Sequence, residues 1–500
     1  MERSSGILLH ITSLPGKYGI GTMGKEARHF VDFLVASGQK LWQILPLGHT
    51  GYGDSPYQCF SAFAGNPLII DLETLCEDGL LLEKELPAPG DFPEDWVDYG
   101  KVFHYKYKLL EKAYARFQKD QHKEIRRQFE SFCASNKDWL DDYAFFMALK
   151  IHHGGKAWTE WDKQIKMRQK GAVQRYREHL SGSIGFYRFL QFVFYQQWLE
   201  LKAYANSNKI EVIGDLPLYV AFDSADAWAN PELFDFDKSL NPRTVAGVPP
   251  DYFSETGQLW GNPIYDWKYL EEHGFQWWIE RVKANFLLYD ILRIDHFRGL
   301  AAYWAVPSGE KTAINGQWIE APGEAMLQAV YKALGEKPII AENLGVITPD
   351  VEEMREKFRM PGMKILQFAF DSGEENEFIP HTYDKNSVVY TGTHDNNTTV
   401  GWFKHSPAAD KQLMRDYFCL NEKDPAWSFI RLAWSTVSDI AIAPMQDILR
   451  LGEEARMNFP GKAPGYWKWR YRADRLTGQH AEDLLKLTRV YGRLHRPTDS

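Results

Sequence analysis

The chain has 500 residues, enough for a large buried core, and a formal net charge of −9 from 58 basic and 67 acidic side chains. Without an excess of positive charge, no nucleic-acid partner is expected. The four cysteines lack metal-ligand spacing and no stretch approaches the ~18 apolar residues of a membrane span, so we expect a soluble, cytoplasmic protein without a membrane partner.

Short apolar runs that end in polar residues, glycine or proline recur along the chain, and most precede a helix-like stretch. The first run, residues 6–16, leads into a segment whose apolar side chains fall on one helical face and whose end is marked by Gly38. The later runs are residues 40–48, 210–220, 289–297, 337–345, 363–370, 386–395 and 437–449. Eight such units predict an α/β fold, the (β/α)8 TIM barrel.

A plain barrel needs ~250 residues, so about half of this chain must lie in insertions. The larger insertion, approximately 60–205, contains long charged and aromatic helices, and we interpret it as a helical subdomain that closes one side of a cleft. The second, approximately 220–275, is rich in Pro, Gly, Asp and Trp, which favours a loop-rich insertion over the cleft. No internal repeat is visible, so residues 1–500 are expected to form a single elaborated catalytic domain.

Two motifs resemble cofactor or metal sites but fit them poorly. Residues 19–24, GIGTMG, match the glycine pattern of dinucleotide-binding loops, yet TSLPGKY, which contains a proline, intervenes between them and the strand's end. The second run also ends in LPLGHTG, without an acidic residue for a ribose. Residues 235–239, DFDKS, lack the other ligands of a calcium loop. No cofactor and no metal is therefore expected.

Acidic residues stand at or just beyond four of the predicted strands, namely Asp215, Asp295, Glu342 and Asp395. Each could cap the helix that follows, since Asp is a common N-cap residue. Capping alone explains poorly why four lie on separate strands, with Arg293 and His394 beside two of them. Because the carboxyl ends of barrel strands converge on one face, the sequence predicts a cluster of carboxylates there.

The neighbours of these acids suggest different tasks for them. Arg293 and Asp295 are two residues apart and project to the same side of a strand, where the arginine can keep the acid ionised, as a carboxylate nucleophile requires. Glu342 is flanked by apolar residues that can raise its pKa, as a general acid needs. Asp395 could hold sugar hydroxyls and offset charge on an oxocarbenium-like transition state. His296 should point to the opposite side of the strand in a structural role.

The aromatic content agrees with a sugar substrate. The chain has 18 Trp, 25 Tyr and 30 Phe, and flat aromatic faces pack against the C–H faces of pyranose rings. The aromatic residues set among Gly, Pro and Asp on the predicted loop face are Tyr52, Tyr57, Tyr252, Phe253 and Trp260.

Longer stretches carry a family resemblance. RIDHFRG at 293–299, AENLG at 341–345 and TGTHDNNTT at 391–399 resemble the strand-end motifs of the α-amylase clan. LLHITSLPGKYGIG, LPLGHTGYGDSPYQCFSAFAGNP, GDLPLYVAFDSAD, VAGVPPDYFSETGQLWGNPIYDW and PMQDIL are similar to one branch, glycoside hydrolase family 77, the 4-α-glucanotransferases called amylomaltase or disproportionating enzyme. One departure is PGKAPGYWKWR, where Lys462 and Tyr466 replace the family's usual Thr and Asn.

The resemblance implies roles position by position. Asp295 would be the nucleophile that forms a covalent ester, and Glu342 would protonate the leaving oxygen and later deprotonate the acceptor. Asp395 would grip hydroxyls of the sugar at the cleavage point. The implied substrate-binding residues are Ser55, Tyr57, Asp215, Asp251, Gln258, Trp260, Arg293, His394 and Asn458.

The implied activity transfers an α-1,4-glucan segment from a donor maltooligosaccharide, starch or glycogen chain to the 4-hydroxyl of an acceptor glucan or glucose, with retention. A hydrolytic α-glucosidase or α-amylase relative would use the same acids, with water as the acceptor. A Pro-rich loop at 247–255 and Trp260 can cover the acceptor side and exclude water, which favours transfer. A non-catalytic glucan-binding barrel is a further alternative, but it would have no need for a nucleophile and an acid together.

Overall fold

The computed structural model describes residues 1–51, 53–86, 92–119, 122–250, 254–373, 375–462 and 465–494. Within this part of the chain, eight parallel strands close into a barrel in the order β1-β12-β11-β10-β9-β6-β3-β2. They are β1 (Ser4–Leu8), β2 (Leu41–Gln43), β3 (Glu211–Leu216), β6 (Ile291–Ile294), β9 (Ile339–Ala341), β10 (Gly362–Ile365), β11 (Ser387–Tyr390) and β12 (Ile440–Pro444). Each overlaps one predicted run, so the (β/α)8 fold class is confirmed.

The barrel strands are short, apolar and almost entirely buried, as parallel strands covered by helices must be. The helices that accompany them include α1 (Lys25–Ala36), α11 (Gln276–Leu288), α12 (Gly323–Leu334), α13 (Pro349–Lys357), α14 (Thr399–His405), α15 (Ala408–Tyr417), α16 (Pro425–Ser435), α17 (Met445–Ile448) and α18 (Gly478–Val490). The first of them buries Ala27, Phe30, Val31 and Leu34 on one face, as predicted, and Gly38 follows its end with a positive φ of 69°.

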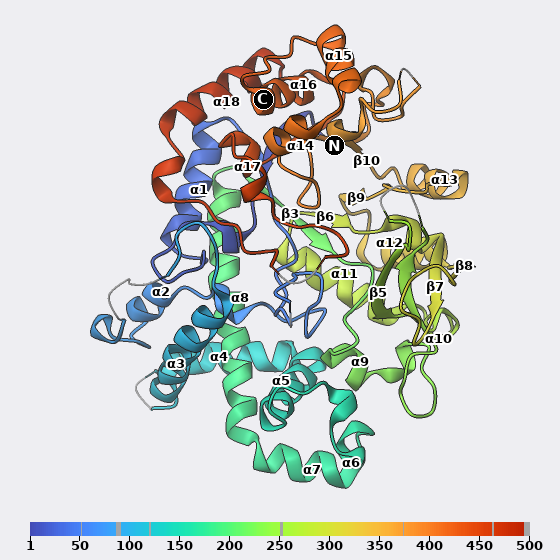
Figure 1. Cartoon of the computed structure of the whole chain (residues 1–500). Helices are drawn as coiled ribbons and strands as arrows, with labels where there is room; N and C mark the ends of the chain where they lie inside the picture. The colour runs from blue at the N-terminus through green and yellow to red at the C-terminus, as the bar shows by residue number, and fades with distance from the viewer. Residues whose placement is uncertain are drawn as a thin grey trace.

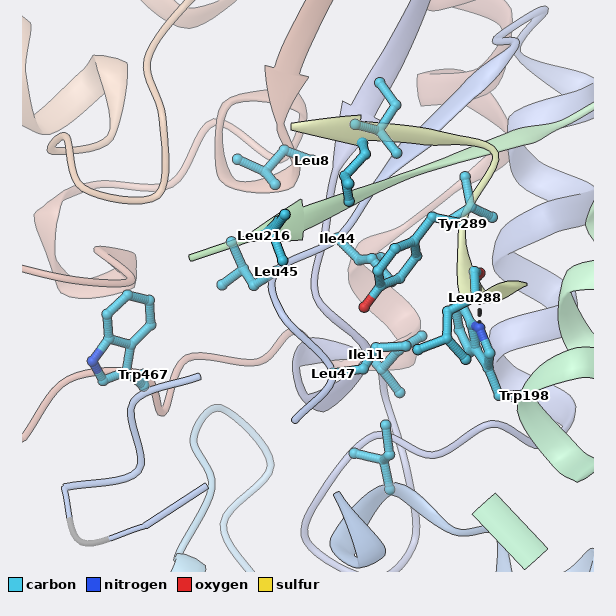
Figure 2. Packing of buried hydrophobic residues seen from close by; sticks show 14 of the residues in the cluster. Leu8, Ile11, Ile44, Leu45, Leu47, Trp198, Leu216, Leu288, Tyr289 and Trp467 are labelled. Carbon is cyan, nitrogen blue, oxygen red and sulfur yellow. Dashed lines mark hydrogen bonds between the residues drawn. The ribbon is translucent and has the colours of Figure 1, made fainter. Parts of the chain in front are cut away.

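Residues 60–205 are largely helical. They contain α2 (Leu72–Glu77), α3 (Tyr99–Phe117), α4 (Lys123–Ser135), α5 (Lys137–His152), α6 (Lys163–Lys166), α7 (Lys170–His179) and α8 (Ser181–Ser207). Figure 1 shows α4 to α7 grouped below the barrel, while α8 runs from this group back to the barrel wall. There the Trp198 indole donates to the Leu288 carbonyl at 2.9 Å and packs near Tyr289 (Figure 2).

Residues 220–275 contain more regular structure than their composition suggested. Besides α9 (Ala225–Ala229) and α10 (Trp267–Glu272), they form β4 (Thr244–Val248) and β5 (Gln258–Pro263). These strands join β7 (Ala302–Pro307) and β8 (Gln317–Glu320) in an antiparallel sheet of order β5-β4-β7-β8, seen on the right of Figure 1. The composition did not reveal them because both are short and contain glycine, and because β4 pairs with β5 and with β7, a strand distant in sequence.

The core is continuous from the barrel into the helical insertion. Figure 2 shows part of it, with Leu8, Ile44, Leu45 and Leu216 from strands and strand ends meeting Leu288 and Tyr289. None of the described helices combines the length and apolar character needed to cross a membrane.

Candidate active site

The predicted acids are brought together at the carboxyl ends of β3, β6 and β9. Asp215 on β3 pairs in register with Arg293 on β6. The Asp295 N–H donates to the Leu216 carbonyl at 3.0 Å and the Glu342 N–H to the Ile294 carbonyl at 3.1 Å, so the ladder continues past the strand ends. Three neighbouring strands therefore present their acids side by side.

Arg293 bridges two of these acids. Its Nη1 donates to both oxygens of Asp215, at 2.7 and 2.6 Å, and its Nη2 lies 2.9 Å from Asp295 Oδ1. Its Nε faces the Met363 thioether at 3.4 Å. Burial lowers the pKa of Arg293, but the charges of Asp215 and Asp295 outweigh it and raise that pKa well above its ordinary value. The guanidinium is therefore a permanent cation that orients both carboxylates.

Glu342 is held differently, by backbone groups. Its Oε2 accepts from the His296 N–H at 2.6 Å and its Oε1 from the Leu344 N–H at 3.0 Å. Burial raises its pKa from 4.5 to about 8; Arg293 opposes this shift and the charge of Asp295 adds to it. At neutral pH this carboxyl group therefore carries a proton, as a general acid must.

His296 departs from the expectation of strand alternation. The strand β6 ends at Ile294, and His296 takes the left-handed conformation with φ 53°, so its direction is set by a turn. This turn lets its N–H reach Glu342, while its ring meets Trp260 edge-on at 4.8 Å between ring centroids. Strand alternation, on which the expected direction of the His296 side chain was based, therefore does not apply at this residue.

Asp395 approaches the cluster from the loop after β11. Its Oδ1 accepts from Asn458 Nδ2 at 2.6 Å, and its Oδ2 lies 3.5 Å from His394 Nε2. Arg456 Nη2 donates to the Asp395 carbonyl at 2.7 Å. The side chain of Asp395 remains 43% exposed, so it is available to a ligand.

An aromatic group connects Asp395 with Asp215. The Tyr57 hydroxyl donates to Asp215 Oδ2 at 2.8 Å, and its ring stacks on His394 with centroids 5.3 Å apart. Trp467 adjoins both rings, at 5.6 Å from Tyr57 and 5.8 Å from His394. Because these rings meet at the carboxylate cluster, they offer flat surfaces beside it.

Other predicted residues lie beyond the carboxylate cluster. Gln258 and Trp260 are on β5, where the indole N–H donates to Gln258 Oε1 at 3.2 Å. The Ser55 hydroxyl accepts from the Tyr57 N–H at 3.2 Å and so supports the turn that carries that ring. Asp251, Tyr52, Tyr252 and Phe253 fall outside the described residues.

The two departures from the family pattern lie around one phenylalanine. Lys462 Nζ sits 3.9 Å from the centroid of the Phe459 ring, and Tyr466 packs 6.2 Å from it. Arg456 covers the same ring at 4.2 Å. The departures therefore lie next to the segment that carries Asn458.

Sequence reasoning missed several residues that touch or support the site: Met363, Asp447, Arg456 and Trp467. Two of them, Asp447 and Trp467, stand in the stretches PMQDIL and PGKAPGYWKWR, which carry the family resemblance or depart from it. A single residue in such a stretch gives no spacing pattern that would identify its partner, so no signal beyond the resemblance could have found them.

This arrangement can carry out carboxylate chemistry on a sugar. One carboxylate is paired with a cation, a second is protonated at neutral pH, and a third lies partly exposed beside stacked rings. Pairs of acids whose environments separate their pKa values are typical of glycosidic cleavage. Across the described ranges, no group of three or more His, Cys, Asp or Glu side chains is arranged to hold a metal ion.

Comparison with known proteins settles the family. The sequence profile of the 4-alpha-glucanotransferase family matches residues 9–477. The chain belongs to the 4-alpha-glucanotransferase family. The resemblance to family 77 is thus confirmed, and the hydrolytic alternative is not favoured.

Relatives within the family match this chain over its whole length. A 4-alpha-glucanotransferase of Synechocystis sp. is 51% identical over 502 residues, covering 100% of this chain and 99% of its own. That of Thermus thermophilus is 47% identical and covers 99% of this chain and 100% of its own. The structure of amylomaltase from Streptococcus agalactiae in complex with acarbose superposes with a TM-score of 0.95 at 43% identity. The match covers 99% of this chain and 100% of the amylomaltase chain.

Proposed function

We propose that Asp295, Glu342 and Asp395 of this 4-alpha-glucanotransferase perform a retaining double displacement on α-1,4-glucans. The observation that carries the proposal is the contrast between two neighbouring carboxyl groups. Asp295 is ion-paired with Arg293, while burial raises the pKa of Glu342 to about 8. A nucleophile and a general acid need these opposite states at the same pH.

In the first displacement, a carboxylate oxygen of Asp295 attacks the anomeric carbon of the donor glucan. The glycosidic bond to the leaving oxygen breaks, and Glu342 transfers its proton to that oxygen. The products are a glycosyl ester on Asp295 and a shortened glucan with a free 4-hydroxyl. Arg293 keeps the attacking carboxylate aimed, because its guanidinium is fixed in turn by Asp215.

In the second displacement, the 4-hydroxyl of an acceptor attacks the same carbon. Glu342, now ionised, takes the hydroxyl proton, and the bond to Asp295 breaks. Two inversions give retention. Asp395 grips the hydroxyls of the sugar at the cleavage point, with Asn458 and His394 holding its carboxylate on either side.

The remaining predicted residues bind the glucan around this point. Tyr57 offers its ring to the sugar at the cleavage point, and Gln258 and Trp260 receive the acceptor. Ser55 and Asp251 are further substrate-binding residues. Donors are maltooligosaccharides, starch or glycogen chains, and glucose can serve as acceptor. The match to an amylomaltase crystallised with acarbose supports a glucan-like ligand in this cleft. We assign residues 60–205 as the wall of one side of the cleft and residues 220–275 as its cover.

The choice between transfer and hydrolysis is tested with maltotriose as the only substrate. Transfer conserves the total number of reducing ends while it produces glucose and longer glucans, whereas hydrolysis raises that number with every turnover. We expect glucose release without a rise in reducing ends. A matching increase of the two would overturn the proposal.

The role of Glu342 is tested with Glu342→Gln. This variant should still bind maltoheptaose in calorimetry but lose turnover by about 10²–10⁴-fold, the usual contribution of a general acid and base. Full turnover by a folded variant would contradict the assignment.

We also propose a cytoplasmic location. All four cysteines are unpaired, which supports this location because disulfides are rare in the cytoplasm. Cell fractionation tests it, and recovery of the protein outside the cytoplasm would overturn it.

A further inference from the structure

A buried acid lies behind the loop that carries Asp395. Asp447 belongs to α17, directly after β12, and is only 1% exposed. Its Oδ2 accepts from the hydroxyls of Thr391 and Thr399 at 2.6 and 2.7 Å, and its Oδ1 accepts from the Thr399 N–H at 2.8 Å. Three donors thus converge on one buried carboxylate.

The two threonines mark the ends of the loop. Thr391 follows the last residue of β11, and Thr399 is the first residue of α14. His394 and Asp395 lie between them. A single carboxylate therefore fixes the distance between the points where the loop leaves the barrel and where it enters the helix.

Other contacts shape the loop but do not replace this anchor. Asn396 accepts from Thr393 within the loop, and Gln367 Nε2 donates to the Asn397 carbonyl at 2.9 Å. Asp395 itself is held through Asn458 and Arg456, which stand on another irregular segment. Because its side chain is 43% exposed, packing does little to aim it, and its direction depends on the loop backbone.

We propose that Asp447 is a positioning residue, which clamps both ends of the 391–399 loop so that Asp395 and His394 meet the sugar in productive geometry. This inference rests on the role proposed above for Asp395. Small displacements of a group that acts on the transition state cost far more in turnover than in ground-state binding, because the geometry is demanded most strictly there.

The chain offers a matched control for the loss of such a carboxylate. Asp71, the N-cap of α2, is also buried and accepts from the Thr22 hydroxyl at 2.7 Å and from the N–H and hydroxyl of Thr74 at 2.8 and 3.0 Å. None of these partners belongs to the carboxylate cluster. Asp71→Ala should therefore lower stability to a similar degree as Asp447→Ala, with unchanged kcat in the folded enzyme.

The first experiment compares kcat and KM for maltotriose at a temperature where every variant is folded. We expect Asp447→Ala to lower kcat by about 10²-fold, the cost typical of a misplaced group, with KM changed only a few-fold. Asp447→Asn should keep most of the activity, because its amide oxygen can accept from the Thr399 N–H while its NH₂ donates to the two hydroxyls. Equal kcat values for Asp447→Ala and Asp71→Ala would overturn the proposal.

A second experiment tests whether Asp447 acts through Asp395. In an Asp395→Ala background, adding Asp447→Ala should cause a much smaller loss of kcat than in the wild type, because one of the two positioned groups is already gone. Fully multiplicative losses would overturn the inference. If Asp395→Ala alone keeps full activity, the role proposed for Asp395 fails instead, so the two failures are distinguishable. Should Asp447→Ala not fold, Thr391→Val against Thr391→Ser provides the same comparison, with loss expected only for valine.

Discussion

Two kinds of hydrogen-bond donor separate the acids of this site. Arg293 gives a full positive charge to Asp215 and Asp295, whereas Glu342 receives only the N–H groups of His296 and Leu344. A neutral amide stabilises a carboxylate less than a cation does, so burial decides the pKa of Glu342. Acids on neighbouring strands are thus held by partners of different charge.

The raised pKa of Glu342 predicts the alkaline limit of activity. In the mechanism proposed above, Glu342 acts as the general acid and needs its proton, which is lost as the pH rises through about 8. We expect kcat/KM for maltotriose to fall on the alkaline side with an apparent pKa near this value. The initial rate of glucose release from pH 5 to 10 measures it. A flat profile up to pH 10 would contradict the proton-donor role.

The same group predicts a pH-dependent stability. Between pH 4.5 and about 8 the native state keeps a proton on Glu342 that the unfolded chain releases, so the free energy of unfolding falls as the pH rises across this window. Glu342→Gln removes this slope. Between pH 5 and pH 8, the melting temperature of Glu342→Gln should rise relative to that of the wild type. A constant difference between the two melting temperatures would contradict the raised pKa of Glu342.

At the scale of single elements, β3 is built around a close approach to Tyr289. A Cβ atom on Gly214 would lie 2.0 Å from the ring of Tyr289, which is itself buried. The strand can bring Asp215 to the site only because residue 214 has no side chain.

Gly214→Ala should therefore destabilise the protein by about 1–3 kcal/mol, the usual cost of overpacking a core, and reduce turnover because Asp215 moves with the strand. Denaturant unfolding and maltotriose assays measure both effects. Gly182→Ala is the matched control, since a Cβ there meets no atom within 4 Å and lies in α8. Equal stability of the two variants would contradict the argument.

The elements also show what a sequence can predict. The barrel strands were found because each is a compact apolar run with its own local signal, as in IAIAP of β12. β4 and β5 were not predicted from the sequence, because TVAGV and QLWGNP become strands only through pairing with β7 and with each other. Local pattern carries no information on such partners.

The site follows the same division. The cluster of acids could be predicted because the ends of the barrel strands converge on one face. The contact between Arg293 and Asp295 could be predicted because the two residues are two apart on one strand. The turn at His296 and the hydrogen bonds of Arg456 depend on backbone angles and on residues distant in sequence. Those are properties of the folded chain, and no periodicity in the sequence reports them.

At the scale of the whole molecule, a buried arginine joins the first and last parts of the chain. Arg493 donates to the Ser4 carbonyl at 2.8 Å and to the Trp434 carbonyl at 2.8 Å, and it is 1% exposed. It thus ties the end of α16 to the first barrel strand, and Figure 1 shows the two chain ends in the same region.

Arg493→Ala should lower the free energy of unfolding by about 2–4 kcal/mol, because several buried carbonyl groups lose their donor. Arg489→Ala, at an exposed position of α18, is the control and should change stability by less than about 0.5 kcal/mol. Guanidinium unfolding followed by tryptophan fluorescence measures the difference. Similar midpoints for the two variants would contradict this role for Arg493.

The pairing of β1 with β12 joins two strands that are synthesised far apart in time. One edge of β1 pairs with β2, at residues 41–43, but its other edge meets residues 440–444, which leave the ribosome much later. At ~5–20 residues per second this takes on the order of a minute, during which the second edge of β1 has no partner strand. Asn458, which holds Asp395, emerges later still. The barrel therefore closes, and Asp395 gains its Asn458 partner, only late in synthesis, so catalytic competence follows the completion of the last barrel strand.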